Sequence, residues 1–313
     1  MHDTATAAIP PVSLLQQQDD PDGFARSLGE SFERFGFAVI ADHGIPDALI
    51  KEAWAQTTAL FDLPLDEKNR YQVPGIAGAR GYTPFGIEIA KGGTANDLKE
   101  FWHVGREEEA GGGPANVWPE ALPAFRPSFT AIFAEFERLG ATLLSGIARH
   151  LKLASDWFQP AIAGGNSTLR LLHYPPVPAD APGVRAGAHE DIDLITLLLG
   201  AEEAGLELRD RDGRWLAIRP PQGTLVVNVG DMLQRLTNHV LPSTTHRVVN
   251  PPPERRGKSR YSMPFFLHPR PDFRIETLPG CVSATNPNRY PEPITERAYL
   301  EERLREIGLR KAS

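Results

Sequence analysis

Cysteine is almost absent from this chain, because Cys281 is the only one among 313 residues. An intrachain disulfide is therefore excluded, and the composition fits a protein of the reducing cytoplasm. The amino terminus has neither a basic start nor an apolar segment, so we expect no secretory signal. These absences predict a cytoplasmic protein.

An excess of positive charge and long apolar runs are also lacking. The formal net charge is −7, which argues against a nucleic-acid-binding surface, because neutralising phosphates requires a concentrated basic patch. The apolar run from Leu194 to Leu199 is interrupted by Thr196 and is far too short to span a bilayer. We therefore expect neither a nucleic-acid partner nor a membrane, and we expect a monomer.

Helical spacing of apolar residues dominates the first half of the chain. After a short strand near Val12, apolar residues from Phe24 to Phe35 recur at helical spacing, and Gly36 is placed to end that helix. The further elements expected here are a strand at 37–40, a helix at about 46–61, a short helix opening at Asp66, a glycine-rich loop or irregular hairpin at 75–93 and a long amphipathic helix at about 123–151.

Short β-like runs separated by turn residues fill the chain from Thr168 onward. They lie at 169–174, 194–199, 206–208, 215–218, 224–229, 246–249 and 260–267. Asp210-Arg211-Asp212-Gly213 predicts a hairpin turn between two of them. Many short strands at this spacing indicate an antiparallel double-sheet jelly roll, so the expected fold is mainly β with flanking helices.

Two histidines and an aspartate form a candidate metal site. His189 and Asp191 lie two positions apart, and His246 follows 55 residues after the aspartate. Residues two apart on a strand share a face, so both could reach one ion; Asp193 lies on that face too and remains an alternative carboxylate. Two imidazoles and one carboxylate, with the other metal positions open, are the ligand set of non-haem Fe(II) oxygenases.

A candidate anion anchor follows the second histidine. Arg260 and Ser262 come 14 and 16 residues after His246, at the start of an apolar strand. The arginine fork can bind a carboxylate through two parallel charged hydrogen bonds, which lysine cannot reproduce. The other basic residues of this run, Arg255, Arg256 and Lys258, are expected at the surface. The combination predicts an Fe(II) enzyme that also binds an anionic cosubstrate.

The positions of the remaining histidines and of several aromatic residues can also be predicted. His173 is a candidate cavity residue, and the others are expected on the surface or hydrogen-bonded in the core: His43, His103, His150, His239 and His268. Substrate specificity is expected from the glycine-rich region through Arg106, the connection 152–168 and the carboxyl-terminal segment. Candidate lining residues are Tyr82, Phe85, Ile87, Phe101 and Trp102.

The order His-x-Asp, distal His, Arg-x-Ser resembles the 2-oxoglutarate/Fe(II)-dependent oxygenases of the isopenicillin N synthase-like superfamily. The resemblance covers most of the chain, and further similar segments are Phe35-Gly36-Phe37, Asp42-His43-Gly44-Ile45-Pro46, Asn228-Val229-Gly230-Asp231-Met232-Leu233-Gln234 and Ser243-Thr244-Thr245-His246-Arg247-Val248. It favours Asp191 over Asp193 as the third metal ligand.

This resemblance implies a double-stranded β-helix core flanked by helices. The implied organisation is an amino-terminal oxygenase region at 7–118, a long helix and connection at 119–165, the Fe(II)/2-oxoglutarate dioxygenase core at 166–270 and a carboxyl-terminal segment at 271–313. The implied reaction hydroxylates or desaturates a small organic molecule while 2-oxoglutarate and O2 give succinate and CO2. Ascorbate is expected to stimulate it.

The resemblance also implies how the cosubstrate binds. The oxo-acid end of 2-oxoglutarate would chelate the iron, and its far carboxylate would contact Arg260 and Ser262. Many members carry Asn-x-Tyr before the core; here Leu172-His173-Tyr174 keeps the tyrosine and loses the asparagine. Tyr174 is thus a further candidate contact.

Three alternatives stay open at this point. The family resemblance also allows an ethylene- or succinate-forming reaction. A zinc hydrolase could use the same three ligands, but zinc does not account for Arg260 and Ser262. A non-catalytic jelly-roll protein would keep the fold without needing all three ligands.

Overall fold

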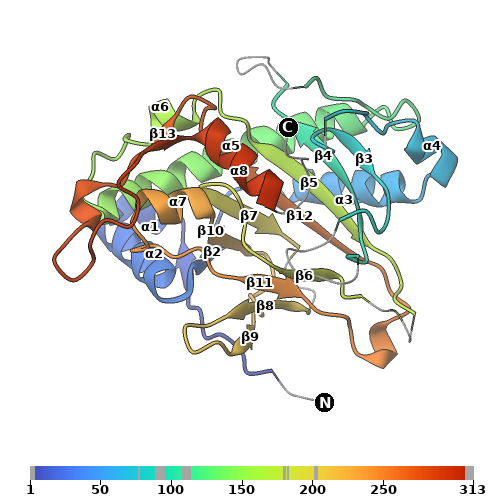
Figure 1. Cartoon of the computed structure of the whole chain (residues 1–313). Coiled ribbons are helices and arrows are strands. Elements are labelled where there is room, and N and C mark those ends of the chain that lie inside the picture. The colour runs from blue at the N-terminus through green and yellow to red at the C-terminus, as the bar shows by residue number, and fades with distance from the viewer. Residues whose placement is uncertain are drawn as a thin grey trace.

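Two β-sheets face each other, and a layer of helices covers the outer side of the larger sheet (Figure 1). The computed structural model describes residues 4–76, 78–88, 96–107, 114–178, 181, 183–200 and 204–306. The expected jelly-roll core with flanking helices is confirmed. None of the helices in these ranges is long and apolar enough to cross a membrane.

The larger sheet has eight strands. Their order is β1 (Pro11–Ser13), β2 (Phe37–Ala41), β10 (Leu225–Val229), β7 (Ile195–Leu199), β12 (Arg260–Leu267), β5 (Thr168–Tyr174), β4 (Glu100–Gly105) and β3 (Gly81–Thr83). All neighbours are antiparallel except β1 and β2. The sequence did not predict β4, and β3 lies in the glycine-rich stretch. Strands from 7–118 and from 166–270 therefore share one sheet.

The smaller sheet closes the opposite side of the core. Its order is β6 (Ala186–His189), β11 (His246–Val248), β8 (Leu206–Arg209) and β9 (Trp215–Ala217). The predicted turn joins β8 to β9, with Gly213 in the left-handed region at φ 80°. A separate ladder pairs β13 (Arg274–Ile275) with β14 (Ile294–Thr295).

The described part of the chain has eight helices, and the longest of them packs on the outer face of the large sheet. They are α1 (Gln16–Asp19), α2 (Pro21–Phe35), α3 (Asp47–Phe61), α4 (Leu65–Asn69), α5 (Phe125–His150), α6 (Gln159–Ile162), α7 (Asp231–Leu236) and α8 (Glu296–Glu306), with short 3-10 turns at Pro253–Arg255 and Pro279–Cys281. Helix α5 contacts β7 and β12, while α2 and α3 pack on α5. The predicted helices near 24–35, 46–61 and 123–151 are confirmed as α2, α3 and α5.

Strand β12 shows how alternation divides the two sides of the large sheet. Phe265 faces the helices, where its ring lies 5.0 Å from that of Phe133 and 5.3 Å from that of Phe136. Arg260 and Ser262 lie on the other face and line a pocket between the sheets. Because successive strand residues point to opposite faces, one set of alternate β12 residues packs against the helix layer, and the other set, which includes Arg260 and Ser262, faces the pocket.

Candidate active site

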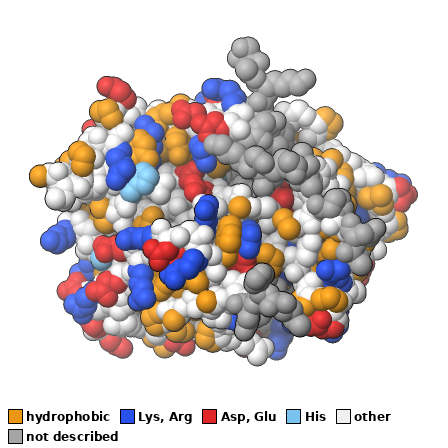
Figure 2. Space-filling model, turned by 60° about the horizontal axis from the view of Figure 1, so that its bottom comes forward, with side chains coloured by type: hydrophobic (Ala, Val, Ile, Leu, Met, Phe, Trp, Pro, Cys, Tyr) orange, Lys and Arg blue, Asp and Glu red, His pale blue; other side chains and the backbone are white. Residues whose placement is uncertain are grey.

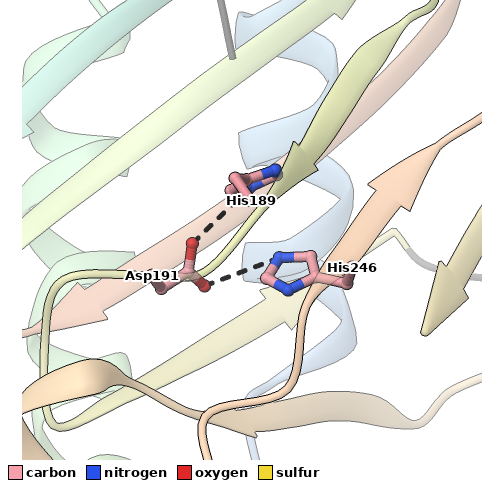
Figure 3. Close-up of side chains that lie close together, drawn as sticks. All are labelled: His189, Asp191 and His246. Atoms are coloured by element: carbon pink, nitrogen blue, oxygen red, sulfur yellow. Dashed lines mark ion pairs between the residues drawn. The ribbon is translucent and has the colours of Figure 1, made fainter. Parts of the chain in front are cut away.

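The three candidate metal ligands converge at one end of the space between the sheets (Figure 3). His189 ends β6, His246 begins β11, and the two are cross-strand partners. Asp191 extends from the loop after β6, with Oδ1 3.7 Å from His189 Nε2 and Oδ2 3.8 Å from His246 Nε2. The two imidazole centroids lie 4.4 Å apart. One ion could contact all three side chains.

Backbone carbonyls select the tautomer of both histidines. His189 Nδ1 lies 2.8 Å from the Gly187 carbonyl, and His246 Nδ1 lies 3.1 Å from the Thr244 carbonyl. A carbonyl oxygen only accepts, so each Nδ1 carries the proton and each Nε2 keeps its lone pair. This arrangement orients Nε2 for a metal, as carbonyl partners of metal-bound histidines commonly do.

The electrostatic environment also favours the coordinating form of His189. Burial, together with the charge of the neighbouring His246, lowers its pKa to about 4. The imidazole is therefore neutral near neutral pH. Neutral imidazole is the form that binds metals.

Asp191 and Asp193 differ in protonation. Burial raises the pKa of Asp191, but the two imidazoles and hydrogen bonds from Thr196 and Asn228 outweigh it and leave the pKa below its ordinary value. Burial and the charge of Asp191 hold the pKa of Asp193 well above the ordinary value. Asp191 is thus ionised near the histidines, while Asp193 takes up a proton much more readily than an ordinary carboxyl does.

The expectation that Asp193 shares the metal-facing side is wrong. Strand β6 ends at His189, so the two-residue alternation does not continue through the following loop. Asp193 is fully buried, contacts Thr196 and lies against Gly230. It is not among the three side chains that converge.

Two polar residues that the sequence analysis did not single out hold Asp191 in place. Thr196 Oγ1 lies 2.5 Å from Asp191 Oδ2, and Asn228 Nδ2 donates to the same oxygen at 2.8 Å. The Asp231 N–H also donates to the Asp191 carbonyl at 2.8 Å. Thr196 and Asn228 each interrupt an apolar strand, β7 and β10, and that interruption was the available signal.

The pocket continues from the metal ligands toward Arg260. It holds about 580 Å³ of space, counting its open mouth, and is lined by His189, Asp191, His246, Tyr174, Arg260 and Ser262 among others. Register places Arg260 opposite Tyr174, and Ser262 opposite Leu172. The pocket therefore brings together every residue predicted for the metal and the anion.

Arg260 is a buried cation whose hydrogen-bonding capacity is only partly used. Its residue is 1% exposed, and neither Nε nor Nη1 has a hydrogen-bond partner within the described part of the chain. The described acidic side chains form no ion pair with it; its nearest aromatic contact is the Tyr174 ring, 5.2 Å from the guanidinium carbon. A buried unpaired guanidinium is costly, so this geometry suits an anionic ligand.

Several sequence assignments change in the structure. His173 points to the helix side, where it bonds Glu100 and Ser259, so its assignment to the cavity is wrong. Tyr82 and Trp102 belong to the core behind the sheet. Phe85 and Ile87 are exposed, whereas Phe101 lies on the face of β4 that looks toward the pocket.

The basic run before β12 is confirmed as surface only in part. Arg255 and Lys258 are exposed, but Arg256 is half-buried. On the face drawn in Figure 2, basic and acidic side chains are interspersed wherever the structure describes them.

Comparisons with known proteins give matches to two family models. The family model of the 2OG-Fe(II) oxygenase superfamily matches residues 165–269, and that of the non-haem dioxygenase in morphine synthesis N-terminal region matches residues 9–121. A 2-oxoglutarate-Fe(II) type oxidoreductase of Emericella nidulans is 34% identical over 310 residues, covering 91% of this chain and 86% of the relative.

Solved structures extend the likeness over nearly the whole fold. A 2OG-Fe(II) oxygenase family protein from Caulobacter crescentus is 54% identical, with a TM-score of 0.89 over 96% of this chain and 100% of that one. A full-length Neurospora crassa protein, solved in complex with alpha-KG, is 29% identical, with a TM-score of 0.87 over 97% of this chain and 99% of that one. The chain accordingly belongs to the 2OG-Fe(II) oxygenase superfamily and is a 2-oxoglutarate-dependent dioxygenase.

Proposed function

We propose that His189, Asp191 and His246 hold the catalytic Fe(II), and that Arg260, Ser262 and Tyr174 hold the far carboxylate of 2-oxoglutarate. The substrate is a small organic molecule that is hydroxylated or desaturated. Two relatives support a small substrate: one is named a proline hydroxylase, and the Neurospora crassa protein was also solved with thymine. We also propose that the enzyme is a monomer and that it works in the cytoplasm, where the single cysteine, which is free and buried, would remain reduced.

The single observation that carries this proposal is the buried, incompletely paired guanidinium of Arg260 in the pocket of the three candidate ligands. A dicarboxylate could satisfy both ends of that pocket, with one end at the metal and the other at the arginine. A zinc hydrolase or a non-catalytic jelly roll has no need for such an anchor. The donor set also fits iron, because two imidazoles and one carboxylate leave positions open for the oxo acid and O2.

The residues of the chain contribute binding, orientation and exclusion of water. The carbonyls of Gly187 and Thr244 orient the imidazoles, while Thr196 and Asn228 fix the carboxylate of Asp191. Apolar residues of both sheets, including Leu198, Leu206 and Val248, wall the space toward Arg260. When bound, Fe(II) supplies the chemistry by which 2-oxoglutarate, O2 and R–H become succinate, CO2 and R–OH in a hydroxylation.

Arg260→Lys tests the anchor. The variant keeps the charge but loses the bidentate fork. A charged hydrogen bond contributes about 1.5–3 kcal/mol, so the affinity for 2-oxoglutarate should fall by roughly 10- to 100-fold while iron binding changes little. The measurement is an anaerobic titration of 2-oxoglutarate into the Fe(II) protein, following the visible charge-transfer band of the chelated oxo acid.

Arg255→Lys is the matched control, because Arg255 lies in the same basic run but is exposed. Its affinity for 2-oxoglutarate should equal that of the parent. Equal affinities in both variants would place the anchor elsewhere. A flat spectrum for the parent at saturating Fe(II) and 2-oxoglutarate would refute the proposed site as a whole.

A further inference from the structure

Two further charged residues line the pocket, in addition to the metal ligands and Arg260. Lys99, just before β4, and Arg170, on β5, both face the pocket. Lys99 Nζ lies 2.9 Å from Glu88 Oε2 and 2.8 Å from Asp97 Oδ2. Arg170 donates from Nη1 and Nη2 to the two oxygens of Glu88, each at 3.2 Å. Glu88 therefore links the two cations.

His103 and the backbone complete this network and make it rigid. Arg170 Nε donates to His103 Nε2 at 2.6 Å, and His103 Nδ1 lies 2.6 Å from the Gly78 carbonyl. Burial and the nearby Arg170 charge hold the pKa of His103 well below its ordinary value, so the imidazole stays neutral. Asp97 also accepts from the Gly187 N–H at 2.9 Å, which ties the network to the strand that carries His189.

The charges of Lys99, Arg170, Glu88 and Asp97 balance one another. Two cations face two carboxylates, and His103 is neutral. Burial lowers the pKa of Lys99 and raises that of Glu88, but the charges of their partners outweigh burial and keep both ionised. The proposed iron site is balanced as well, because Fe(II) and Arg260 together offset Asp191 and the two charges of 2-oxoglutarate. An anionic substrate would add an uncompensated charge to a buried site, which is costly.

The hydrogen-bonding groups that this network leaves unused are N–H donors. Among the described residues, Lys99 uses two of its three N–H groups, and Arg170 uses three of its five. Both carboxylates are already engaged by charged partners. Within the described residues, the network can therefore offer N–H groups to a ligand, and it suits ligand atoms that accept hydrogen bonds.

Two aromatic rings lie beside these donors. The Arg170 guanidinium carbon is 4.2 Å from the centre of the Phe101 ring and 5.4 Å from that of Phe266. Phe266 lines the pocket and pairs in register with Thr196, which bonds Asp191. A planar molecule could lie against Phe266, close to the metal ligands, and direct its edge toward Arg170.

We propose that Lys99 and Arg170 form the subsite for the primary substrate, a compact, uncharged, planar molecule that carries carbonyl oxygens. This inference rests on the proposed function, since it assigns the rest of the same pocket. Arg170 binds a carbonyl through its free N–H groups, Lys99 supplies a further donor, and Phe266 covers the face of the ring. The pocket limits the size of the substrate, because the same pocket also has to accommodate 2-oxoglutarate.

The test uses the anaerobic Fe(II) protein saturated with 2-oxoglutarate and four probes of similar size. Uracil and 2-pyridone are planar, uncharged carbonyl compounds, benzoate is a planar anion, and piperidine is a cation at neutral pH. Each probe is titrated while the visible charge-transfer band is followed, and succinate formation is then measured in air. The two carbonyl rings should perturb the band with at least 10-fold higher affinity than the other probes, and should stimulate succinate formation.

Arg170→Lys and Phe266→Leu separate this subsite from the anchor for 2-oxoglutarate. Each should weaken uracil binding by 10-fold or more and leave the affinity for 2-oxoglutarate within twofold of the parent. Arg255→Lys should change neither. Phe266→Leu keeps the charged network intact, so it remains informative if Arg170→Lys fails to fold.

The outcomes distinguish the two proposals. No band with Fe(II) and 2-oxoglutarate contradicts the proposed function and this inference together. A normal band that neither carbonyl ring perturbs, or that benzoate or piperidine perturbs at equal or lower concentration, overturns the inference alone. Loss of affinity for 2-oxoglutarate but not for uracil in Arg170→Lys would also overturn it.

Discussion

Asp191 and Asp193 show how two identical side chains in one loop acquire different chemistry. The Thr196 hydroxyl lies 2.5 Å from Asp191 and 2.8 Å from Asp193. A hydroxyl has only one hydrogen, so it can donate to just one of them. The pKa of Asp193 is raised and that of Asp191 is lowered, so Asp193 is the carboxyl that takes up a proton more readily, and we expect the Thr196 hydrogen to go to Asp191. Asp193 thereby contacts the hydroxyl group that orients Asp191, the proposed metal ligand.

Asn substitutions at these two positions should have opposite outcomes. Asp191→Asn removes the anionic ligand, so iron affinity should fall by more than roughly 100-fold, beyond the usual loss on removing a supporting partner. Asp193→Asn keeps the size of the side chain, provides a donor for Thr196 and leaves the three converging ligands in place, so iron should be retained. Iron content after anaerobic gel filtration measures both. Retention in Asp191→Asn together with loss in Asp193→Asn would reverse the assignment.

Gly36 connects α2 to β2 and lies against the segment that precedes β11. It ends α2 in the left-handed region at φ 66°, and its N–H donates to the Phe32 carbonyl at 2.7 Å. A Cβ at this position would overlap the side chain of Thr244 and approach the Pro242 carbonyl to 2.6 Å. The Thr244 carbonyl also orients His246. The end of α2 is therefore packed against the segment that presents a proposed metal ligand.

Gly36→Ala should lower both stability and metal affinity. The left-handed backbone alone costs a non-glycine residue about 1–3 kcal/mol, and the overlap adds to this. The free energy of unfolding by urea and the affinity for Fe(II) should both decrease. Gly257→Ala is the control, because Gly257 has no atom within 4 Å of an added Cβ and no left-handed φ. Unchanged stability and iron affinity in Gly36→Ala would contradict this packing argument.

At the scale of the whole molecule, the proposed site lies between the two sheets and couples ligand binding to folding. His189 and His246 belong to the small sheet, whereas Arg260 and Ser262 belong to the large one. A metal and a dicarboxylate that contact both sets would connect the sheets. The same ligand would pair the buried guanidinium of Arg260, which uses only part of its hydrogen-bonding capacity among the described residues.

Removing Fe(II) and 2-oxoglutarate should therefore lower the temperature of unfolding. Ligand at 100 times its Kd stabilises a folded protein by about 2.7 kcal/mol. Thermal unfolding measured anaerobically should show the largest increase with both ligands present and a smaller one with either alone. Arg260→Lys should lose most of the increase due to 2-oxoglutarate. Identical unfolding temperatures with and without both ligands would argue against a site that spans the sheets.

Much of the fold could be predicted from the sequence because its signals are local. Turn residues and runs of β-forming residues predicted the strands now seen as β5, β7 to β12, and helical spacing ending at Gly36 predicted α2. Strand β6 was not among the predicted strands, although His189 was placed on one. The ligand chemistry could also be predicted from the sequence, because it depends on the type and order of four residues: His189, Asp191, His246 and Arg260.

Other features depend on which distant strands pair, and only the tertiary structure decided them. The register of β4 with β5 and of β5 with β12 directs His173 toward Glu100 and places Arg170 on the pocket side. A shift of one residue would reverse these faces, and no local pattern specifies the register between distant segments. The end of β6 at His189 likewise separates Asp191 from Asp193. The sequence by itself thus determined the candidate chemistry and most elements, while pairing between distant strands decided which side chains share the pocket.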